Sequence, residues 1–225
     1  MLRINDIAPN FDAVSTEGSI NLHQYLSDSW GILFSHPKDF TPVCTTELGY
    51  MAKIEKEFKS RNCKLIGLSV DSVEDHHKWK KDIEETQGVK VSYPLIADEN
   101  LQIAKLYNML PSDEVNDGKR TAMTNATVRS IFLIDPDKKI RMTLTYPMTT
   151  GRNFDEIIRV LDSVQLTSKN KVATPAQWKQ NDDVIIVPAV TDEEAKELFG
   201  DFKKIKPYLR YTTVSYTHLR AHETN

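Results

Sequence analysis

WGILFSHPKDFTPVCTTELGYMAKIEKEFKSRNCKLIGLSV, residues 30–70, contains two apolar runs on either side of an amphipathic segment. The runs at 30–35 and 64–70 are short and almost continuously apolar, which is typical of buried strands. Between them, residues 45–60 place apolar side chains at helical spacing and predict a helix with one buried face. A strand, a helix and a second strand joined by short links are typical of an α/β sheet.

The same alternation continues on the C-terminal side of this stretch. Hydrophobic periodicity predicts helices at 72–86 and 100–107, and strands at 93–97, 129–134 and 140–146. The last two strands flank a turn of aspartate and proline and should form a hairpin, so we expect the sheet to be mixed. One α/β domain over residues 1–166 is therefore predicted.

The remaining residues predict a small appendage followed by a tail. A strand at 184–187 and a helix at 192–199, which Gly200 ends, give residues 167–212 the pattern of a small α+β extension. Residues 213–225, TVSYTHLRAHETN, show no apolar periodicity, and we expect a disordered tail or a remnant of cloning.

Composition argues against several classes of function. The net charge is -3, so neither nucleic acid nor an anionic membrane is expected as the main partner. No apolar run reaches the length of about 18 residues that integral membrane association needs, and residues 1–9 show no secretory signal. The two cysteines, Cys44 and Cys63, are too few for a disulfide-stapled domain, and no cluster has zinc-ligand spacing. We expect a cytoplasmic protein without a bound metal.

Cys44 carries the clearest chemical signal. The predicted strand before it ends where two prolines, Pro37 and Pro42, follow. Cys44 itself falls in the first turn of a predicted helix. Unpaired backbone N–H groups and the positive end of the helix dipole gather there, and both favour the thiolate, which is the nucleophilic form. Thr41 could offer a hydroxyl to the same pocket, while Pro37 and Pro42 fix the backbone. Such a thiolate could reduce a peroxide if a cation assisted it, but the residues alone do not select one arginine.

Several motifs carry a resemblance that covers about residues 3–212. The pattern Pro37-x-x-x-Thr41-x-x-Cys44 resembles the active-site motif of peroxiredoxins, and TVR at 127–129 is a further match. Three further stretches resemble the branch of this family that has one catalytic cysteine, the branch like peroxiredoxin six. They are YPMTTGRNFDEI at 146–157, VATPAQW at 172–178 and YLRY at 208–211. The resemblance implies a thioredoxin-like fold with a mixed central sheet, flanking helices and a C-terminal extension. It also implies a homodimer or a higher oligomer.

The resemblance implies a reaction as well: reduction of hydrogen peroxide and of organic hydroperoxides, including those of lipids, in antioxidant defence. Cys44 would be oxidised to a sulfenic acid, Thr41 would hydrogen-bond the peroxide, and Pro37 would shield the sulfur. Arg129 would be the cation that stabilises the thiolate and binds the peroxide. The supporting residues would be Glu47 and Arg152, in a hydrogen-bond network, and His36, beside the sulfur.

The cysteine pattern implies how such an enzyme is reset. Relatives with two cysteines carry a resolving cysteine near the C-terminus, and here no cysteine follows Cys63. Cys63 opens an apolar strand, which indicates a buried and unreactive thiol. An external thiol must then reduce the sulfenic acid, and the family implies glutathione, delivered by a glutathione transferase. No cofactor is expected.

Two other functions stay open. The same fold could serve a redox-sensing chaperone or binding protein, in which Cys44 reports oxidation without turnover. Some members of this branch also hydrolyse phospholipids with a serine, a histidine and an aspartate, and the matching positions are Ser29, His23 and Asp137. That serine lies in SDSWG, which lacks the leading glycine of the family, so we favour a plain turn before a strand.

Overall fold

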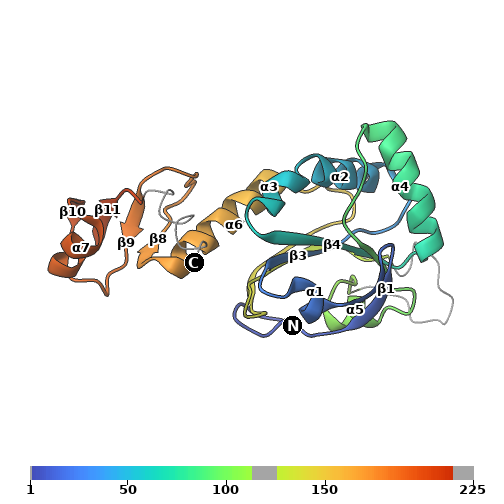
Figure 1. The fold of residues 1–225 in the computed structure, drawn as a ribbon, viewed down its shortest axis with the longest axis horizontal. Helices are drawn as coiled ribbons and strands as arrows, with labels where there is room; N and C mark the ends of the chain where they lie inside the picture. The colour runs from blue at the N-terminus through green and yellow to red at the C-terminus, as the bar shows by residue number, and fades with distance from the viewer. Residues whose placement is uncertain (1, 113–125, 215–225) are drawn as a thin grey trace. The chain divides into compact units, whose positions relative to one another are not determined.

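The computed structural model describes residues 2–112 and 126–214, and its larger part is built on a seven-stranded sheet (Figure 1). The strands follow the order β2-β1-β5-β4-β3-β6-β7 across the sheet. Their bounds are β1 Asp12–Ser15, β2 Gly18–Asn21, β3 Trp30–Ser35, β4 Cys63–Ser69, β5 Leu95–Ala97, β6 Arg129–Ile134 and β7 Ile140–Tyr146.

The centre of the sheet is parallel and its two sides are antiparallel. β3 pairs in parallel with β4, and β4 with β5, because helical crossovers return the chain to the same end of the sheet. β6 pairs antiparallel with both β3 and β7. The predicted hairpin and the mixed sheet are therefore confirmed. All six residues of β3 are buried, which explains why its sequence is apolar without alternation.

Helices lie on both faces of this sheet (Figure 1). The helices of the larger part are α1 Leu22–Leu26, α2 Pro42–Lys53, α3 Glu55–Lys59, α4 Val73–Gln87 and α5 Gln102–Leu106. α1 and α5 share one core cluster with the central strands, as Leu26, Ala104, Leu33 and Ile66 show. α2, α3 and α4 lie on the opposite face, and they bring the N-terminal end of α2 next to the end of β3.

Two details of the helices bear on the site. The single helix expected at 45–60 is two helices, because the chain turns at Ile54, where φ is -98° and ψ is 9°. α2 begins at Pro42, whose fixed φ suits a first turn and whose missing N–H leaves no donor unpaired there. Cys44 therefore lies in the first turn, as predicted. α4 follows Ser72, whose Oγ accepts from the Asp75 N–H at 3.1 Å, as the sequence also indicated.

The chain divides into two compact units, Met1–Phe154 and Asp155–Asn225, whereas the sequence placed the boundary between residues 166 and 167. The difference arises at α6, Phe154–Lys169, which is one uninterrupted amphipathic helix. Its periodicity predicts that one face is buried but does not tell which unit that face joins. Among the described residues, no helix has the length and apolar character needed to cross a membrane.

The second unit contains a four-stranded antiparallel sheet in the order β10-β11-β9-β8. Its elements after α6 are β8 Val172–Ala173, β9 Val184–Ile186, α7 Asp192–Phe199, β10 Lys203–Lys206 and β11 Leu209–Thr212. Trp178 and Val184 belong to its small core, against which Val214 packs. Thr213 donates to Asp183 Oδ1 at 3.0 Å, so ordered contacts extend two residues into the expected tail. The rest of that tail, residues 215–225, lies outside the described residues.

Candidate active site

Cys44 lies where the loop 36–41 leads from β3 into the first turn of α2. Thr41 is the N-cap residue, but its hydroxyl donates to the Lys38 carbonyl oxygen at 2.8 Å and does not cap the helix. The backbone N–H groups of the first turn therefore have no side-chain acceptor at the cap and can face a ligand. The positive end of the helix dipole at this point supports a negative charge on the sulfur.

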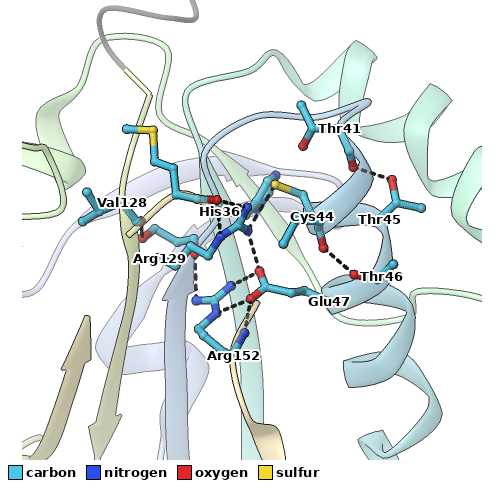
Figure 2. A network of polar contacts seen from close by, with 12 residues as sticks. His36, Thr41, Cys44, Thr45, Thr46, Glu47, Val128, Arg129 and Arg152 are labelled. Atoms are coloured by element: carbon cyan, nitrogen blue, oxygen red, sulfur yellow. Dashed lines mark hydrogen bonds and ion pairs between the residues drawn. The ribbon is translucent and has the colours of Figure 1, made fainter. Parts of the chain in front are cut away.

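Arg129 is the cation that reaches Cys44, from the first position of β6 (Figure 2). Its Nη1 lies 3.4 Å from the Cys44 Sγ and 2.7 Å from Glu47 Oε2. Its Nε and Nη2 donate to the Met148 carbonyl oxygen at 2.8 and 2.5 Å. Arg129 is 2% exposed and Cys44 is 0% exposed, so water screens this charge–sulfur contact little. These bonds fix the guanidinium in the orientation that faces the sulfur.

Glu47 and Arg152 form the support behind Arg129 (Figure 2). Arg152 donates to Glu47 Oε1 from its backbone N and its Nε at 2.8 and 2.9 Å, and its Nη2 donates to Oε2 at 2.7 Å. The remaining Nη1 donates to the carbonyl oxygens of Ser35 and Ser130 at 2.9 and 3.1 Å. Arg152 thus ties α2 to β3 and β6. Arg152 lies just before the N-terminus of α6, where the helix dipole disfavours a cation, and this buried pairing with Glu47 compensates for that cost.

The charges of this cluster do not balance without the sulfur. Burial opposes ionisation of Glu47, but the hydrogen bonds and charge of Arg152, together with the charge of Arg129, lower the pKa of Glu47 below its ordinary value. Two guanidinium cations and one carboxylate then leave one positive charge in a buried site. A thiolate at Cys44 would complete the neutral set, which is the physical reason to expect the anionic form there.

Pro37, Thr41 and His36 all lie on the loop 36–41 that leads into the cysteine helix. Pro37 is buried and Thr41 is partly buried. His36 is fully buried, and its Nε2 donates to Asp39 Oδ1 at 2.7 Å. Its carbonyl oxygen accepts from Thr127 Oγ1 at 2.8 Å. Of the residues that the resemblance implied, Arg129, Glu47 and Arg152 form the cluster at Cys44. Pro37, Thr41 and His36 lie on the loop that leads to it, and the His36 side chain contacts Asp39.

Two buried residues of this region were missed by the sequence reasoning. Asp39 accepts a second hydrogen bond, from His76 Nδ1 at 2.6 Å, and His76 is 0% exposed. The sequence contained a usable signal, since His76, Trp79 and Ile83 recur at helical spacing on the buried face of α4. The adjacent His77 is exposed, as expected for a neighbour on the opposite side of the helix.

Cys63 is at the other end of the sheet. It pairs with Trp30, the first residue of β3, whereas Cys44 follows the last residue, Ser35. Five strand positions at about 3.3 Å each separate these two ends by about 16 Å, far beyond the reach of a disulfide. Burial raises the pKa of the Cys63 thiol well above its ordinary range, so it stays protonated and inert.

The structure gives no support for a catalytic arrangement of the three residues matched to a lipid hydrolase. His23 Nε2 lies 2.7 Å from the Ala8 carbonyl oxygen, so that nitrogen donates and cannot accept a proton from a serine. Ser29 is buried just before β3, and Asp137 is exposed in the β6–β7 turn. Among the described residues, no hydrogen bond links these three side chains.

Comparison with known families agrees with this geometry. Residues 4–143 match the AhpC/TSA family, and residues 163–201 match the C-terminal domain of 1-Cys peroxiredoxin. The chain is 58% identical over 212 residues to the 1-Cys peroxiredoxin of Dictyostelium discoideum, with 94% of this chain and 85% of the relative covered. It is 53% identical over 222 residues to peroxiredoxin-6 of Gallus gallus, with 94% and 97% covered.

Solved structures resemble this one over almost the whole chain. The yeast mitochondrial 1-Cys peroxiredoxin superimposes with a TM-score of 0.87 at 55% identity, covering 95% of this chain and all of the other. A cysteine-to-serine variant of peroxiredoxin 6 from Arenicola marina gives a TM-score of 0.89 at 46% identity, covering 96% of this chain and all of the other. The expected thioredoxin-like fold with a C-terminal extension is confirmed. The chain belongs to the AhpC/TSA family and, within it, to the 1-Cys peroxiredoxins, which are thiol peroxidases.

Proposed function

We propose that Cys44 is the peroxidatic cysteine of this thiol peroxidase and that Arg129 holds both its thiolate and the peroxide. The observation that carries the proposal is the 3.4 Å contact between Arg129 Nη1 and the Cys44 Sγ, inside a buried cluster with one uncompensated positive charge. A guanidinium in that position favours the nucleophilic sulfur before reaction. It also stabilises the oxygen on which negative charge develops when the O–O bond breaks.

The reaction balances with these groups. The Cys44 thiolate attacks the peroxide oxygen that carries hydrogen, the O–O bond breaks, and the leaving oxygen takes a proton from the solvent to give water or an alcohol. The cysteine is left as a sulfenic acid. Thr41 gives its hydroxyl hydrogen to the Lys38 carbonyl, so its oxygen is free to accept the O–H of an incoming hydroperoxide. Hydrogen peroxide and organic hydroperoxides, including those of lipids, are the proposed substrates.

Access to the sulfur depends on the loop 36–41. Cys44 is fully buried, and Pro37 of this loop is buried as well, so we infer that the loop must shift slightly to admit a peroxide. The shielding has a chemical use, because it excludes bulk water from the thiolate and strengthens its interaction with Arg129. Hydrogen peroxide should therefore react faster than a bulky hydroperoxide.

An external thiol is proposed to reset the enzyme. Cys63 lies too far away and is too strongly protonated to attack the sulfenic acid. Two external thiols reduce it instead: the first forms a mixed disulfide with Cys44 and releases water, and the second releases the oxidised thiol. Glutathione, delivered by a glutathione transferase, is our proposed reductant. The published structure of the yeast relative names both glutathione and thioredoxin systems for that protein.

Assembly and location are proposals of the same kind. We propose a homodimer, able to assemble further, and a cytoplasmic protein; the relative from Saccharomyces cerevisiae is named as mitochondrial. Size-exclusion chromatography with light scattering tests the first proposal, and a monomer at micromolar concentration would contradict it. Cell fractionation tests the second.

Peroxide consumption by the purified protein tests the central proposal. With excess dithiothreitol, the wild type should remove hydrogen peroxide through many turnovers, and Cys44→Ser should remove none above background. A cysteine that acts only as a redox sensor would lack the peroxide-binding arrangement and would consume hydrogen peroxide little faster than background, although dithiothreitol reduces it again. A wild-type rate equal to that of Cys44→Ser would refute the assignment of Cys44. Cys63→Ser is the matched control and should keep the wild-type rate.

A further inference from the structure

Two histidines and an aspartate form a fully buried group outside the Cys44–Arg129–Glu47 cluster. Asp39 Oδ1 is 2.7 Å from His36 Nε2, and Asp39 Oδ2 is 2.6 Å from His76 Nδ1. All three side chains are sealed from solvent. His76 Nε2 faces the Ile96 carbonyl oxygen at 3.1 Å, whereas His36 Nδ1 has no hydrogen-bond partner among the described residues.

These contacts fix where the protons are. Both partners of His76 are acceptors, a carboxylate and a carbonyl, so both of its ring nitrogens must carry hydrogen and the ring is a cation. His36 donates from Nε2 to the same carboxylate. Its Nδ1 is best left bare, since a second proton there would create a buried charge without an acceptor. The group is then a neutral set of His76⁺, Asp39⁻ and an uncharged His36.

A metal ion fits the same residues less well. The ligand atoms lie within 4.8 Å of one another, as a metal site would require. However, zinc binds nitrogen and oxygen ligands at about 2.0–2.2 Å in a tetrahedral arrangement. Two such ligand atoms then lie more than about 3 Å from each other. The observed separations of 2.6 and 2.7 Å are those of charge-assisted hydrogen bonds. A proton, and not a metal, joins each pair.

The electrostatic surroundings agree with this assignment. Burial alone would lower the pKa of His76, but the hydrogen bond and charge of Asp39, the Ile96 carbonyl and the charge of Asp71 raise it above its ordinary value. Burial would raise the pKa of Asp39, and the hydrogen bonds of His36 and His76 instead lower it to about 2. The groups that face His76 are thus Asp39 and His36 from the loop 36–41, Asp71 two residues after β4, and the Ile96 carbonyl of β5.

The group includes part of the loop 36–41, which leads into the cysteine helix. Asp39 lies on that loop between Pro37 and Thr41, and its backbone N–H donates to Asp71 Oδ2 at 2.9 Å. The His36 ring packs on Trp79 with centroids 5.1 Å apart, and Trp79 Nε1 donates to Thr45 Oγ1 at 3.2 Å. Thr45 follows the reactive cysteine on α2. His36 and Asp39 of this group therefore belong to the loop itself. The group also contacts the first turn of the cysteine helix through Trp79.

We propose that His76 is a positioning residue for the peroxidase reaction. As a buried imidazolium paired with Asp39, it holds the loop 36–41 in the reactive arrangement. The same pairing keeps His36 in a single tautomer. The proposal rests on the proposed roles of Cys44, Pro37 and Thr41. His76 touches neither the sulfur nor the substrate in this scheme, and it acts through Asp39. Loss of its proton removes the ion pair that anchors the loop.

The protonation states can be measured directly on the full-length reduced protein. With nitrogen-15 labelled histidine at about pH 7, His76 should show two protonated ring nitrogens, and His36 one protonated and one bare nitrogen. Spectra of His76→Gln and His77→Gln assign the signals. If His76→Gln does not fold, His36→Gln removes the other buried signal and assigns His76 by difference. A bare nitrogen on His76 at this pH would overturn the proposal.

Rate measurements test the positioning role. We expect His76→Gln to slow the reaction of hydrogen peroxide with Cys44 by about tenfold, the effect of losing one charged hydrogen bond, and His77→Gln to stay within about twofold of wild type. The wild-type rate should fall as the pH rises through the raised pKa of His76, and His76→Gln should lack this fall.

Two results of these experiments would sink the proposal. The first is a His76→Gln protein that matches His77→Gln at every pH while Cys44→Ser is inactive, since the peroxidase assignment then stands and the role of His76 does not. The second is retention of one zinc ion per chain after incubation with zinc chloride and desalting, if His76→Gln abolishes it.

Discussion

Replacing Glu47 by glutamine would remove the buried negative charge that Arg129 and Arg152 share while keeping the shape of the side chain. Glu47 accepts hydrogen bonds from Arg129 Nη1 and from three donors of Arg152. A glutamine NH2 group must face at least one of these donors, and the two guanidinium cations lose their common anion. Removing one partner of a buried ion pair costs about 3–5 kcal/mol, so we expect a loss of that size in the free energy of unfolding.

Urea denaturation at about pH 7 measures this loss, with Glu57→Gln as the matched control. Glu57 lies on α3, its side chain is 58% exposed, and it pairs with Arg61 at 2.9 Å. An exposed pair of this kind contributes at most about 1 kcal/mol. Equal losses for Glu47→Gln and Glu57→Gln would refute the reasoning that the buried cluster depends on this carboxylate.

The pH dependence provides an independent check on the same variant. The pKa of Glu47 in the folded protein lies below its ordinary value of 4.5, because its arginine partners outweigh the effect of burial. Its stabilising contribution is therefore complete above that ordinary value and is lost as the pH falls through the folded pKa. The difference in unfolding free energy between wild type and Glu47→Gln should shrink as the pH falls below 4.5. A difference that stays constant with pH would contradict the assignment.

Substitutions at three positions test other features of the protein. Arg129→Met should slow peroxide reduction by about a hundredfold, and an unchanged rate of hydrogen peroxide consumption would contradict the role drawn from the contact at 3.4 Å. Cys63→Ala should leave the peroxidase rate unchanged and lower the unfolding free energy by about 1 kcal/mol in urea denaturation, because a small buried side chain is shortened. The free energy of unfolding of Cys44→Asp should exceed that of Cys44→Asn by about 1–3 kcal/mol, because the buried cluster lacks one negative charge. The reverse order of stability in urea denaturation would contradict this charge balance.

The sheet and the cysteine turn were predictable because local patterns determine them. The apolar run at β3 and the Pro42–Cys44 sequence each specify their structure within a few residues, and both agree with the prediction. The four-residue strands β1, β2, β10 and β11 were not predicted, because strands this short leave too few alternating positions to recognise.

Long-range pairings could not be derived from the residues alone. Arg129 is separated from Cys44 by 85 positions, and nothing in its local sequence distinguishes it from an exposed strand arginine. The resemblance named it, and the sheet order explains it, because β6 pairs beside β3 and so places its first residue next to the end of β3. The pairing of His76 could not be predicted from the local sequence either. Its partner Asp39 lies 37 positions away, and the resemblance offered no hint of it.

The charge balance of the site also links the two halves of the catalytic cycle. When the Cys44 thiolate becomes a sulfenic acid, the sulfur loses its negative charge, while Arg129 and Arg152 keep theirs and share only Glu47. The buried cluster then carries an uncompensated positive charge beside an electrophilic sulfur. An incoming thiolate supplies the missing charge and the attacking electron pair together, whereas the protonated, distant Cys63 supplies neither. The same arginine contact that makes the reduced sulfur nucleophilic therefore favours resetting by an external thiolate over resetting from within the chain.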